Sequence, residues 1–324
     1  MRRGLVDYYI NFPTNEPRPA AGREQSALAA AGAVTGPVKI KGNMRDGASS
    51  LKKYGMATIA NDKIIQWLLP FLESYLATNA ATPLYVIPYD DNVSLTRRAA
   101  AIYGVHIAEP DSADLDALAK RLYPLFPAHR RRLRKFLSLA LPLDEVIYLD
   151  ADVILFRDFR SMFGRLEAGK SDFIVAAQTG DYVYNKNSAQ YDFLRGAMLF
   201  NDGFFVASNA ILGLQDFHDV IERDEAIFHA VRQRGMLFAQ PLTNFVVHRL
   251  GLRVLPVWAC VPGASGESFY KAEGVTFDAT GPRDSQGDEI YFAHWAGAVS
   301  FPSRRVFDAA WCQYAVQAAE RTRI

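Results

Sequence analysis

Residues 143–158 read LDEVIYLDADVILFRD, and this stretch decides the fold. An apolar run from Val146 to Leu149 ends in two aspartates, Asp150 and Asp152, with one residue between them. The pattern indicates a buried strand followed directly by a pair of carboxylates. Burial of two neighbouring carboxylates is unfavourable unless a cation compensates them. Hard divalent cations such as Mg²⁺ and Mn²⁺ prefer carboxylate oxygen and often hold substrate phosphates, so the pair predicts a metal site. The structural alternative is a loop whose aspartates only cap backbone amides.

Strand and helix patterns alternate before this stretch. We predict strands at 55–60, 83–91, 105–110 and 145–150, and helices at 62–78, 94–104 and 130–142. Mixed strands and helices continue through 173–178, 196–208, 236–250 and 289–299. Such alternation predicts an α/β fold with a mostly parallel sheet and helices on both faces. Ligands of these sheets bind beyond the carboxyl ends of the strands. The polar residues expected at that edge are Asn61, Asp62, Asp90, Asp91, Asp150 and Asp152.

Bulk composition narrows the classes of protein. The chain has 324 residues, with 36 Lys and Arg against 35 Asp and Glu, so its net charge gives no reason to expect nucleic acid as a partner. No apolar stretch approaches the roughly 20 residues that cross a bilayer. The N-terminus lacks the apolar core of a signal peptide. We therefore expect a cytoplasmic protein, with Cys260 and Cys312 as free thiols.

The first 50 residues differ from the rest because they are rich in Ala, Gly and Pro and lack a sustained period. We interpret residues 1–50 as an N-terminal arm with a short helix at 23–32. Such an arm can wrap the domain or a second subunit, which would make a homo-oligomer. A loosely ordered extension fits the composition equally well. Residues 51–324 show no convincing linker and are expected to form one domain.

One class that fits the aspartate pair is the haloacid-dehalogenase-type phosphatases. Their strand leads into D-x-D-x-[TV], which LDADV at 149–153 resembles in its two aspartates, and Asp150 would be the nucleophile. That motif normally lies near the start of its domain, whereas three strand–helix units precede it here. The late acidic motif is also incomplete, since Gly287 and Asp288 lack the second aspartate. The phosphatase therefore stays a minor alternative.

Several stretches together resemble another class, the glycogenin/galactosyltransferase-like family, glycosyltransferase family 8. The similar stretches are ATIANDKII (57–65), RKFLSLALPLDEVIYLDADVILFRDF (134–159), LFNDGFFVAS (199–208), AQPLTNFVV (239–247) and AHWAG (293–297). They resemble, in order, the family's T-N-D loop, lysine-containing helix with D-x-D, F-N-[SA]-G, D-Q-x-x-L-N and H-[FY]-x-G segments. The resemblance covers about residues 55–300 and implies a GT-A fold, the Rossmann-like nucleotide-diphospho-sugar transferase fold with a mixed sheet flanked by helices.

The resemblance implies a metal and nucleotide site. Asp150, Asp152 and His294 would ligate Mn²⁺ or Mg²⁺. Arg134 or Lys135 would face the diphosphate or the sugar. The other nucleotide contacts would be Ala57, Thr58, Asn61, Asp62, Ala151, Gly203 and Gly297, with Asp150 near the ribose. Several of these candidates have a structural alternative. His294 can be a core histidine beside Trp295, Asn61 can be a helix N-cap, and residues 129–135 can form the solvated basic face of a helix. The basic helix can also contact anionic membrane lipid.

The resemblance also implies a sugar pocket made by Asn201, Asp202, Gly203 and Gln240. The structural alternative for 201–203 is a turn between two strands. Two departures stand out, because Ala239 replaces the acidic residue before the family's glutamine, and Ser300 replaces a late lysine. Arg304 or Arg305 is a substitute cation for the leaving diphosphate.

The implied activity is a metal-dependent, retaining hexosyltransferase. It would move a sugar from a nucleotide-sugar donor, most simply a UDP-sugar, to the hydroxyl of a glycan, a lipid-linked sugar, a protein or a small molecule. The two departures support an alternative from another class, a non-catalytic protein of the same fold that binds nucleotide-sugars or glycans. The sequence alone does not identify the base, the sugar or the acceptor.

Overall fold

The computed structural model describes residues 52–125, 127–176, 183–232, 239–269, 271–296 and 305–323. The predicted arm at 1–50 lies outside these ranges, as do Gly297, Ser300 and Arg304. Within the described residues, no helix combines the length and the apolar character that a bilayer crossing requires. Both Cys260 and Cys312 are free thiols, as expected.

Seven strands of the described chain form the main sheet, in the order β3-β2-β1-β4-β7-β6-β8. Their bounds are β1 Tyr54–Ala60, β2 Leu84–Pro88, β3 His106–Ile107, β4 Glu145–Leu149, β6 Phe173–Val175, β7 Phe204–Ser208 and β8 Val254–Pro256. The first four strands in this order are parallel, and β7 runs antiparallel to both β4 and β6. Every residue of β4 is buried, which explains its unbroken apolar run, because helices cover both faces of the sheet.

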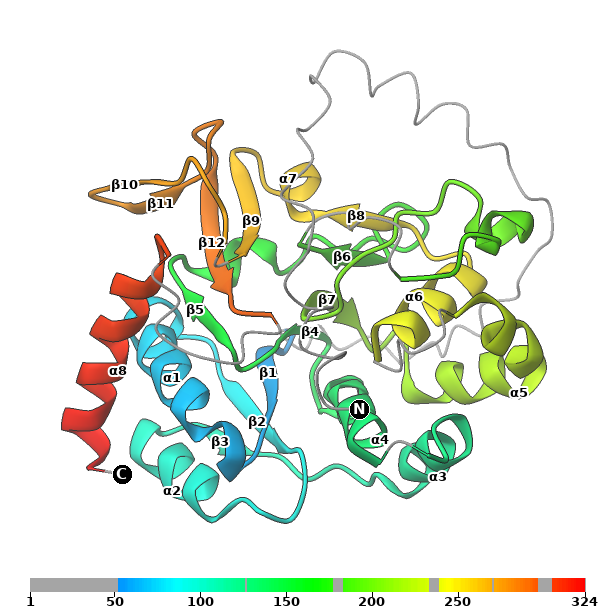
Figure 1. Ribbon diagram of the computed structural model, residues 1–324, viewed down its shortest axis with the longest axis horizontal. Coiled ribbons are helices and arrows are strands. Elements are labelled where there is room, and N and C mark those ends of the chain that lie inside the picture. Colours follow the sequence, from blue (N-terminus) through cyan, green and yellow to red (C-terminus); the bar gives the residue numbers. More distant parts are fainter. Residues whose placement is uncertain are drawn as a thin grey trace, which may run out of the picture. The chain divides into compact units, whose positions relative to one another are not determined.

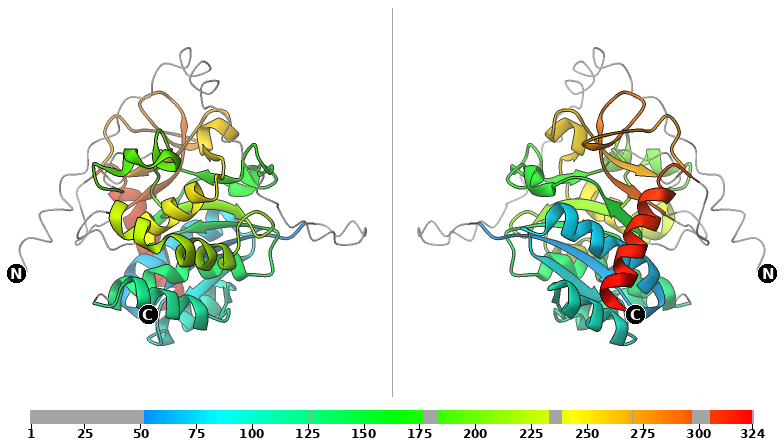
Figure 2. Two further views of the ribbon diagram at one scale, coloured as in Figure 1. Left: turned by 90° about the vertical axis from the view of Figure 1, so that its right-hand side faces the viewer. Right: turned by 90° about the vertical axis from the view of Figure 1, so that its left-hand side faces the viewer.

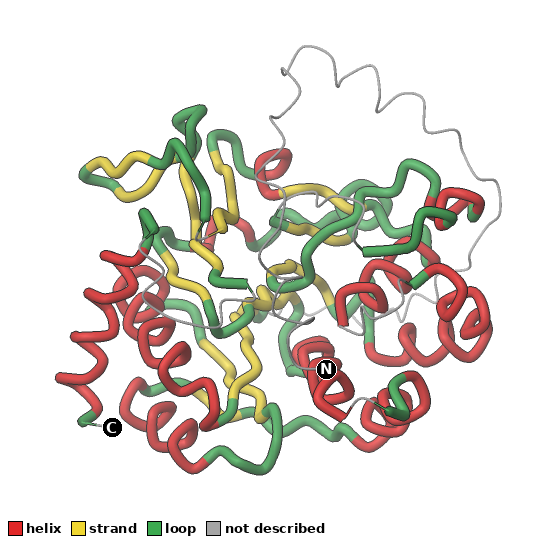
Figure 3. The backbone as a smooth tube through the Cα atoms, viewed as in Figure 1, coloured by secondary structure: helices red, strands yellow, loops and turns green. Residues whose placement is uncertain are grey.

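The helices form two groups on opposite faces of this sheet (Figures 1 and 3). One core lies under α1 (Ile65–Asn79) and α2 (Ser94–Tyr103), and α8 (Asp308–Thr322) packs along α1. The other core lies under α3 (Ala113–Leu122), a 3₁₀ helix (Leu133–Ala140), α5 (Leu214–Val231) and α6 (Ala239–Arg249). The short helices α4 (Pro127–Arg132) and α7 (Val257–Cys260) are the remaining α-helices of the described chain. Figure 2 shows the two groups from either side. The predicted α/β architecture is therefore confirmed.

A second sheet contains the strand that follows the aspartate pair. It contains β5 (Val153–Leu155), β9 (Ala264–Phe269), β10 (Thr276–Asp278), β11 (Gly281–Arg283) and β12 (Glu289–His294). The chain leaves β4, turns through the aspartate pair and enters β5, which pairs antiparallel with β12. The register sets Val153 opposite His294. This pairing brings Asp152 beside a histidine from the far end of the chain.

Several predicted elements differ in detail from the observed ones. The helix predicted at 130–142 is α4 followed by the 3₁₀ helix, and the strand predicted at 105–110 keeps only two residues. The helix predicted at 62–78 begins with a 3₁₀ turn that Asn61 caps by accepting a hydrogen bond from the Lys63 amide, 3.1 Å away. Gly104 ends α2 in the left-handed conformation (φ 65°), as its position predicts.

Candidate functional site

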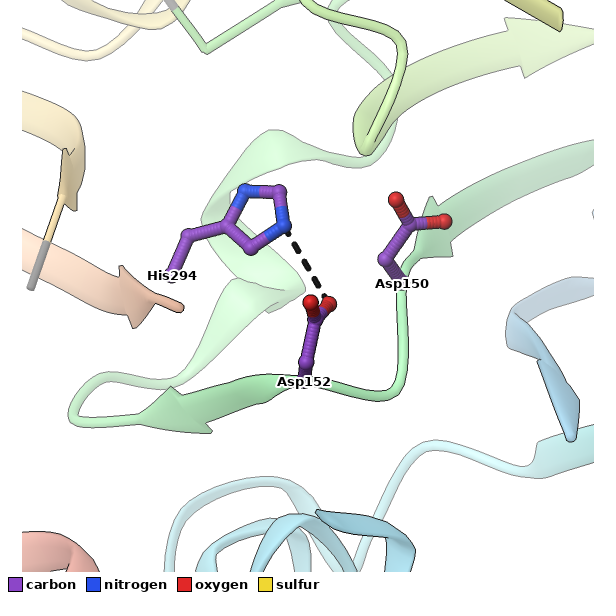
Figure 4. Close-up of side chains that lie close together, drawn as sticks. All are labelled: Asp150, Asp152 and His294. Atoms are coloured by element: carbon purple, nitrogen blue, oxygen red, sulfur yellow. Dashed lines mark ion pairs between the residues drawn. The ribbon is translucent and has the colours of Figure 1, made fainter. Parts of the chain in front are cut away.

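Two carboxylate side chains and one imidazole side chain converge where the two sheets meet. Asp150 and Asp152 lie in the turn between β4 and β5, and His294 ends β12. Their ligand atoms all lie within 4.8 Å of one another, and His294 Nε2 is 3.2 Å from Asp152 Oδ1. Figure 4 shows the three side chains pointing toward one another. The predicted ligands are therefore brought together by the pairing of β5 with β12.

The carboxylate of a fourth residue, Glu267, contacts the ring nitrogen of His294 that faces away from Asp152. His294 is 2% exposed, and its Nδ1 lies 2.5 Å from Glu267 Oε1 on β9, the strand parallel to β12. Burial alone would lower the pKa of His294, but the carboxylates of Asp152 and Glu267 raise this pKa well above its ordinary value. Each ring nitrogen thus lies next to a carboxylate oxygen. A carboxylate behind a histidine fixes which ring nitrogen faces a metal.

Gly203 allows His294 and Asp150 to lie close to its backbone. A Cβ on this residue would lie 2.6 Å from His294 Cε1 and 3.0 Å from Asp150 Oδ2. The Gly203 carbonyl accepts a hydrogen bond from the Asp150 amide at 2.8 Å, which ties β7 to the aspartate turn. Two carboxylates and one imidazole form a donor set that suits Mn²⁺ or Mg²⁺. The residues present therefore fit a divalent cation.

Lys135 supplies the buried positive charge next to this cluster. Its Nζ lies 3.0 Å from Asp202 Oδ1 and 3.4 Å from Asp150 Oδ1, and the residue is only 4% exposed. Burial would lower the pKa of Lys135, but Asp150 and Asp202 together raise it, so the ammonium stays charged. Tyr148 donates a hydrogen bond to the same Oδ1 of Asp150 at 2.7 Å. Asp150 Oδ1 thus has two partners, Tyr148 and Lys135, whereas Asp150 Oδ2 lies beside Gly203.

Arg134, the other basic candidate, points away from the cluster. A 3₁₀ helix has three residues per turn, so consecutive side chains point in well-separated directions. The Arg134 guanidinium lies 2.8 Å from Asp116 Oδ2 and 3.3 Å from the Pro88 carbonyl oxygen. It lines a cleft of about 350 Å³ with Asp90 and Asp91. Of the two candidates, the structure places Lys135 beside a predicted metal ligand, Asp150.

The polar residues after β1 form a separate group. Asn61 Nδ2 donates to Asp90 Oδ2 at 3.0 Å, and Arg131 forms an ion pair with the same oxygen at 2.8 Å. Asp62 accepts from the Thr96 amide at 2.8 Å in the first turn of α2. Burial would raise the pKa of Asp62, but hydrogen bonds from α2 lower it. Two further nucleotide candidates, Ala57 and Thr58, are fully buried inside β1. Contact of these residues with a base or ribose stays a prediction.

The predicted sugar residues lie where the loop before β7 meets α6. Asn201 Oδ1 accepts from the Gly203 amide at 2.7 Å, and Gln240 is buried in the first turn of α6. Asn244 bonds both backbone groups of Phe200, with Oδ1 accepting at 3.0 Å and Nδ2 donating at 2.9 Å. Asn201 to Gly203 and Gln240 are thus brought to one region. Their contact with a sugar stays a prediction.

Sequence reasoning missed Glu267. The residue is 27 positions from His294 and no strand was predicted around it, so only the parallel pairing of β9 with β12 reveals it. The substitute cation, Arg304 or Arg305, stays a prediction. Arg305 is exposed, and its amide donates to Asp308 Oδ2 at 3.2 Å, whereas Ser300 and Arg304 lie outside the described residues.

Comparisons with known proteins define the fold. No protein-family model matches the chain, and no curated protein matches it in sequence. The galactosyltransferase LgtC, solved in complex with donor and acceptor sugar analogues, aligns with a TM-score of 0.54 and 16% identity, over 81% of this chain and 95% of LgtC. The bifunctional glycosyltransferase WbbM in its apo form aligns with a TM-score of 0.55 and 11% identity, over 86% of this chain and 53% of WbbM.

These likenesses confirm the expected GT-A glycosyltransferase fold. The chain spans about half the length of the WbbM structure that it matches. At such low identities the likeness shows the fold alone, and a fold by itself does not establish an activity. Whether the chain shares the chemistry of family 8 therefore has to be argued from its own site.

Proposed function

We propose that this chain is a metal-dependent, retaining glycosyltransferase. It takes a hexose from a nucleotide-diphosphate donor, a UDP-sugar, and joins it to an acceptor hydroxyl on a glycan, a lipid-linked sugar or a small molecule. The observation that carries the proposal is the convergence of Asp150, Asp152 and His294, whose ligand atoms all lie within 4.8 Å of one another. This cluster lies beyond the carboxyl end of β4, where α/β sheets bind ligands. The donor and acceptor analogues in the LgtC structure lend support to this class of reaction.

Breaking the bond between sugar and phosphate leaves negative charge on the nucleoside diphosphate. Mn²⁺ or Mg²⁺, when bound, supplies the positive charge that stabilises this leaving group. In this chain, Asp150, Asp152 and His294 would hold the cation, and Glu267 would keep the imidazole in place. Tyr148 and Lys135 fix the orientation of Asp150 through its Oδ1.

The remaining predicted residues divide between the two halves of the donor. The nucleotide half would contact Ala57, Thr58, Asn61, Asp62, Ala151, Gly203 and Gly297. Asn201, Asp202 and Gln240 would bind the sugar. Ala239 leaves α6 without a carboxylate at its start, which argues against a covalent intermediate there. We propose front-face attack, in which the acceptor oxygen bonds to the anomeric carbon, the bond to the diphosphate breaks, and the diphosphate takes the acceptor proton.

The test measures release of nucleoside diphosphate from UDP-glucose, UDP-galactose and GDP-mannose, with Mn²⁺ and with EDTA. We expect release from at least one donor with Mn²⁺ and none with EDTA. Asp152→Asn should reduce release by about 100-fold or more, because it removes a charged ligand. Asp158→Asn is the matched control. Asp158 caps a 3₁₀ turn through the Arg160 amide, and asparagine caps equally well. Nucleoside diphosphate release that is unchanged by EDTA and by Asp152→Asn would contradict the proposal.

The departure at Ala239 supports one alternative, a GT-A protein that binds a nucleotide-sugar or glycan without catalysis. That protein would bind a donor with Mn²⁺ but would release no nucleotide with any acceptor. A phosphatase would instead release phosphate from simple phosphomonoesters. The same donor panel, with phosphomonoesters added, separates these outcomes.

A further inference from the structure

The turn between α3 and α4 carries the most exposed large apolar side chain of the described chain. Leu125 is 80% exposed there, whereas the other exposed side chains of this kind range from 37% to 58%. The turn is tied to α4, because Arg130 Nε donates to the Tyr123 carbonyl at 2.8 Å and Nη2 donates to the Pro124 carbonyl. A single exposed leucine is ordinary on a protein surface, so its surroundings decide whether it has a role.

Basic side chains lie on both sides of this leucine. The last turn of α3 contributes Lys120 and Arg121, and α4 contributes Arg131 and Arg132. The two helices pack against each other and lie side by side in Figure 1. We call the following exposed residues the basic corner: Lys120, Arg121, Leu125, Arg131 and Arg132.

The basic corner presents positive charge to solvent even where it forms ion pairs. Arg131 pairs with Asp90 Oδ2 at 2.8 Å, and the arginine side chain is 48% exposed while the aspartate is 7% exposed. Arg121 pairs with Glu225 Oε2 at 3.2 Å, and the exposed fractions are 49% and 31%. The carboxylates therefore lie deeper than the guanidinium groups, and an approaching partner meets the cations first.

Helix electrostatics explains only half of this arrangement. α3 has acids in its first turn and Lys120 and Arg121 in its last turn, which complements the helix dipole. α4 does not follow this pattern, because its six residues include three consecutive arginines, 130–132. An arginine run next to a highly exposed leucine stabilises neither helix, so it points to a partner outside the chain.

We propose that the basic corner docks the protein on a membrane surface that carries anionic lipid. Lysine and arginine attract anionic headgroups, and a leucine between them can enter the boundary between headgroups and acyl chains. Stable attachment to a bilayer takes two signals, and the corner combines charge with an apolar side chain. A nucleic acid would attract the same cations but would have no use for Leu125. The inference needs neither the metal site nor the proposed reaction.

Docking at this corner has a consequence for the candidate site. Arg131 pairs with Asp90, which Asn61 also contacts, and α4 continues directly into the 3₁₀ helix that carries Lys135. The basic corner thus adjoins the polar edge of the sheet. Together with the proposed function, and resting on it, this position favours a lipid-linked sugar among the acceptor classes.

The experiment measures cosedimentation of the full chain with vesicles of phosphatidylcholine, alone or with about one third phosphatidylglycerol. We expect binding to the anionic vesicles that weakens as salt is raised, and binding at least about 10-fold weaker to the neutral vesicles. Lys120→Gln/Arg132→Gln should weaken binding to anionic vesicles about 10- to 30-fold, since each cation contributes about 5-fold. Leu125→Ser should weaken it about 10-fold through loss of apolar contact.

Each variant has a matched control elsewhere in the chain. Lys170→Gln/Arg195→Gln removes the same charge from side chains that are 70% and 68% exposed. Val316→Ser removes an apolar side chain of α8 that is 58% exposed. We expect both controls to bind anionic vesicles within about twofold of wild type.

Three results would overturn the inference. They are absence of binding to anionic vesicles, equal losses in the variants and their controls, and equal binding to neutral vesicles. A parallel titration with duplex RNA covers the other polyanion, and RNA binding that is tighter than vesicle binding and unchanged by Leu125→Ser would also overturn it. Vesicle binding requires no Mn²⁺ and no donor, so its failure leaves the proposed function standing, and failure of nucleotide release leaves the docking surface standing.

Discussion

Replacement of Gly203 by alanine gives the sharpest local test of the metal site. The added Cβ would lie 2.6 Å from His294 Cε1 and 3.0 Å from both Asn201 Oδ1 and Asp150 Oδ2. Ordinary van der Waals contact begins at 3.4 Å, so the His294 ring would have to move by roughly 0.8 Å. That ring is buried and is held 2.5 Å from Glu267, so it cannot move alone. Gly203 does not have a positive φ, and the effect is therefore one of contact and not of backbone strain.

The expected magnitude follows from this geometry. Overpacking of a filled site costs about 1–3 kcal/mol of unfolding free energy. Metal sites tolerate ligand displacements of only about 0.2 Å, so we expect Mn²⁺ affinity to fall by at least about 10-fold. Titration followed by the electron paramagnetic resonance signal of free Mn²⁺ measures this affinity, and urea unfolding measures the stability.

Gly213→Ala is the matched control for this experiment. Gly213 is the N-cap of α5, and the nearest atom to its added Cβ is Asp216 Oδ2 at 3.8 Å, so there is room for a methyl group. We expect this variant to bind Mn²⁺ like wild type. If Gly203→Ala also binds Mn²⁺ like wild type, the ligands do not converge as described, and the reasoning is refuted.

Three further predictions test separate parts of the account. Glu267→Gln should weaken Mn²⁺ binding about 10- to 100-fold, because it loosens the support behind His294, and an unchanged Mn²⁺ titration would count against that role. Lys135→Met should lower the unfolding free energy by about 3–5 kcal/mol, since it leaves the buried carboxylate of Asp202 without its cation; a loss below about 1 kcal/mol in urea would show that the pairing is unimportant. Burial lowers the pKa of His248 to about 4, so the folded state resists protonation that the unfolded state accepts below about pH 6.5. Unfolding free energy should therefore fall between about pH 6.5 and 4, by up to about 3 kcal/mol from this group, and His248→Gln should flatten that decline; identical pH profiles would contradict the assignment.

Much of the fold could be predicted from local sequence. The apolar run into Asp150 indicates β4 because a strand covered on both faces needs no polar side chain, and Gly104 marks the end of α2 because glycine adopts the left-handed conformation easily. Local patterns could not separate an α-helix from a 3₁₀ helix at 133–140. The contacts of the two side chains decide which one faces the site, since Arg134 pairs with Asp116, whereas Lys135 lies between Asp150 and Asp202.

The site itself could be predicted only where a motif marks it. Asp150 and Asp152 stand out because two adjacent carboxylates after a buried strand require compensation, and His294 was reached through a family resemblance. The contact of Glu267 with His294 depends on the pairing of β9 with β12, two segments distant in the sequence. No local period encodes such pairing, so this support emerges only from the structure.

The most direct test of the central claim is a crystal structure grown with Mn²⁺ and UDP, with diffraction measured at the manganese absorption edge. The account predicts an anomalous peak bounded by Asp150, Asp152 and His294, with the diphosphate of UDP on its open side. An anomalous peak at another place, or UDP bound without manganese away from these three residues, would contradict the claim that this cluster is the donor-binding metal site.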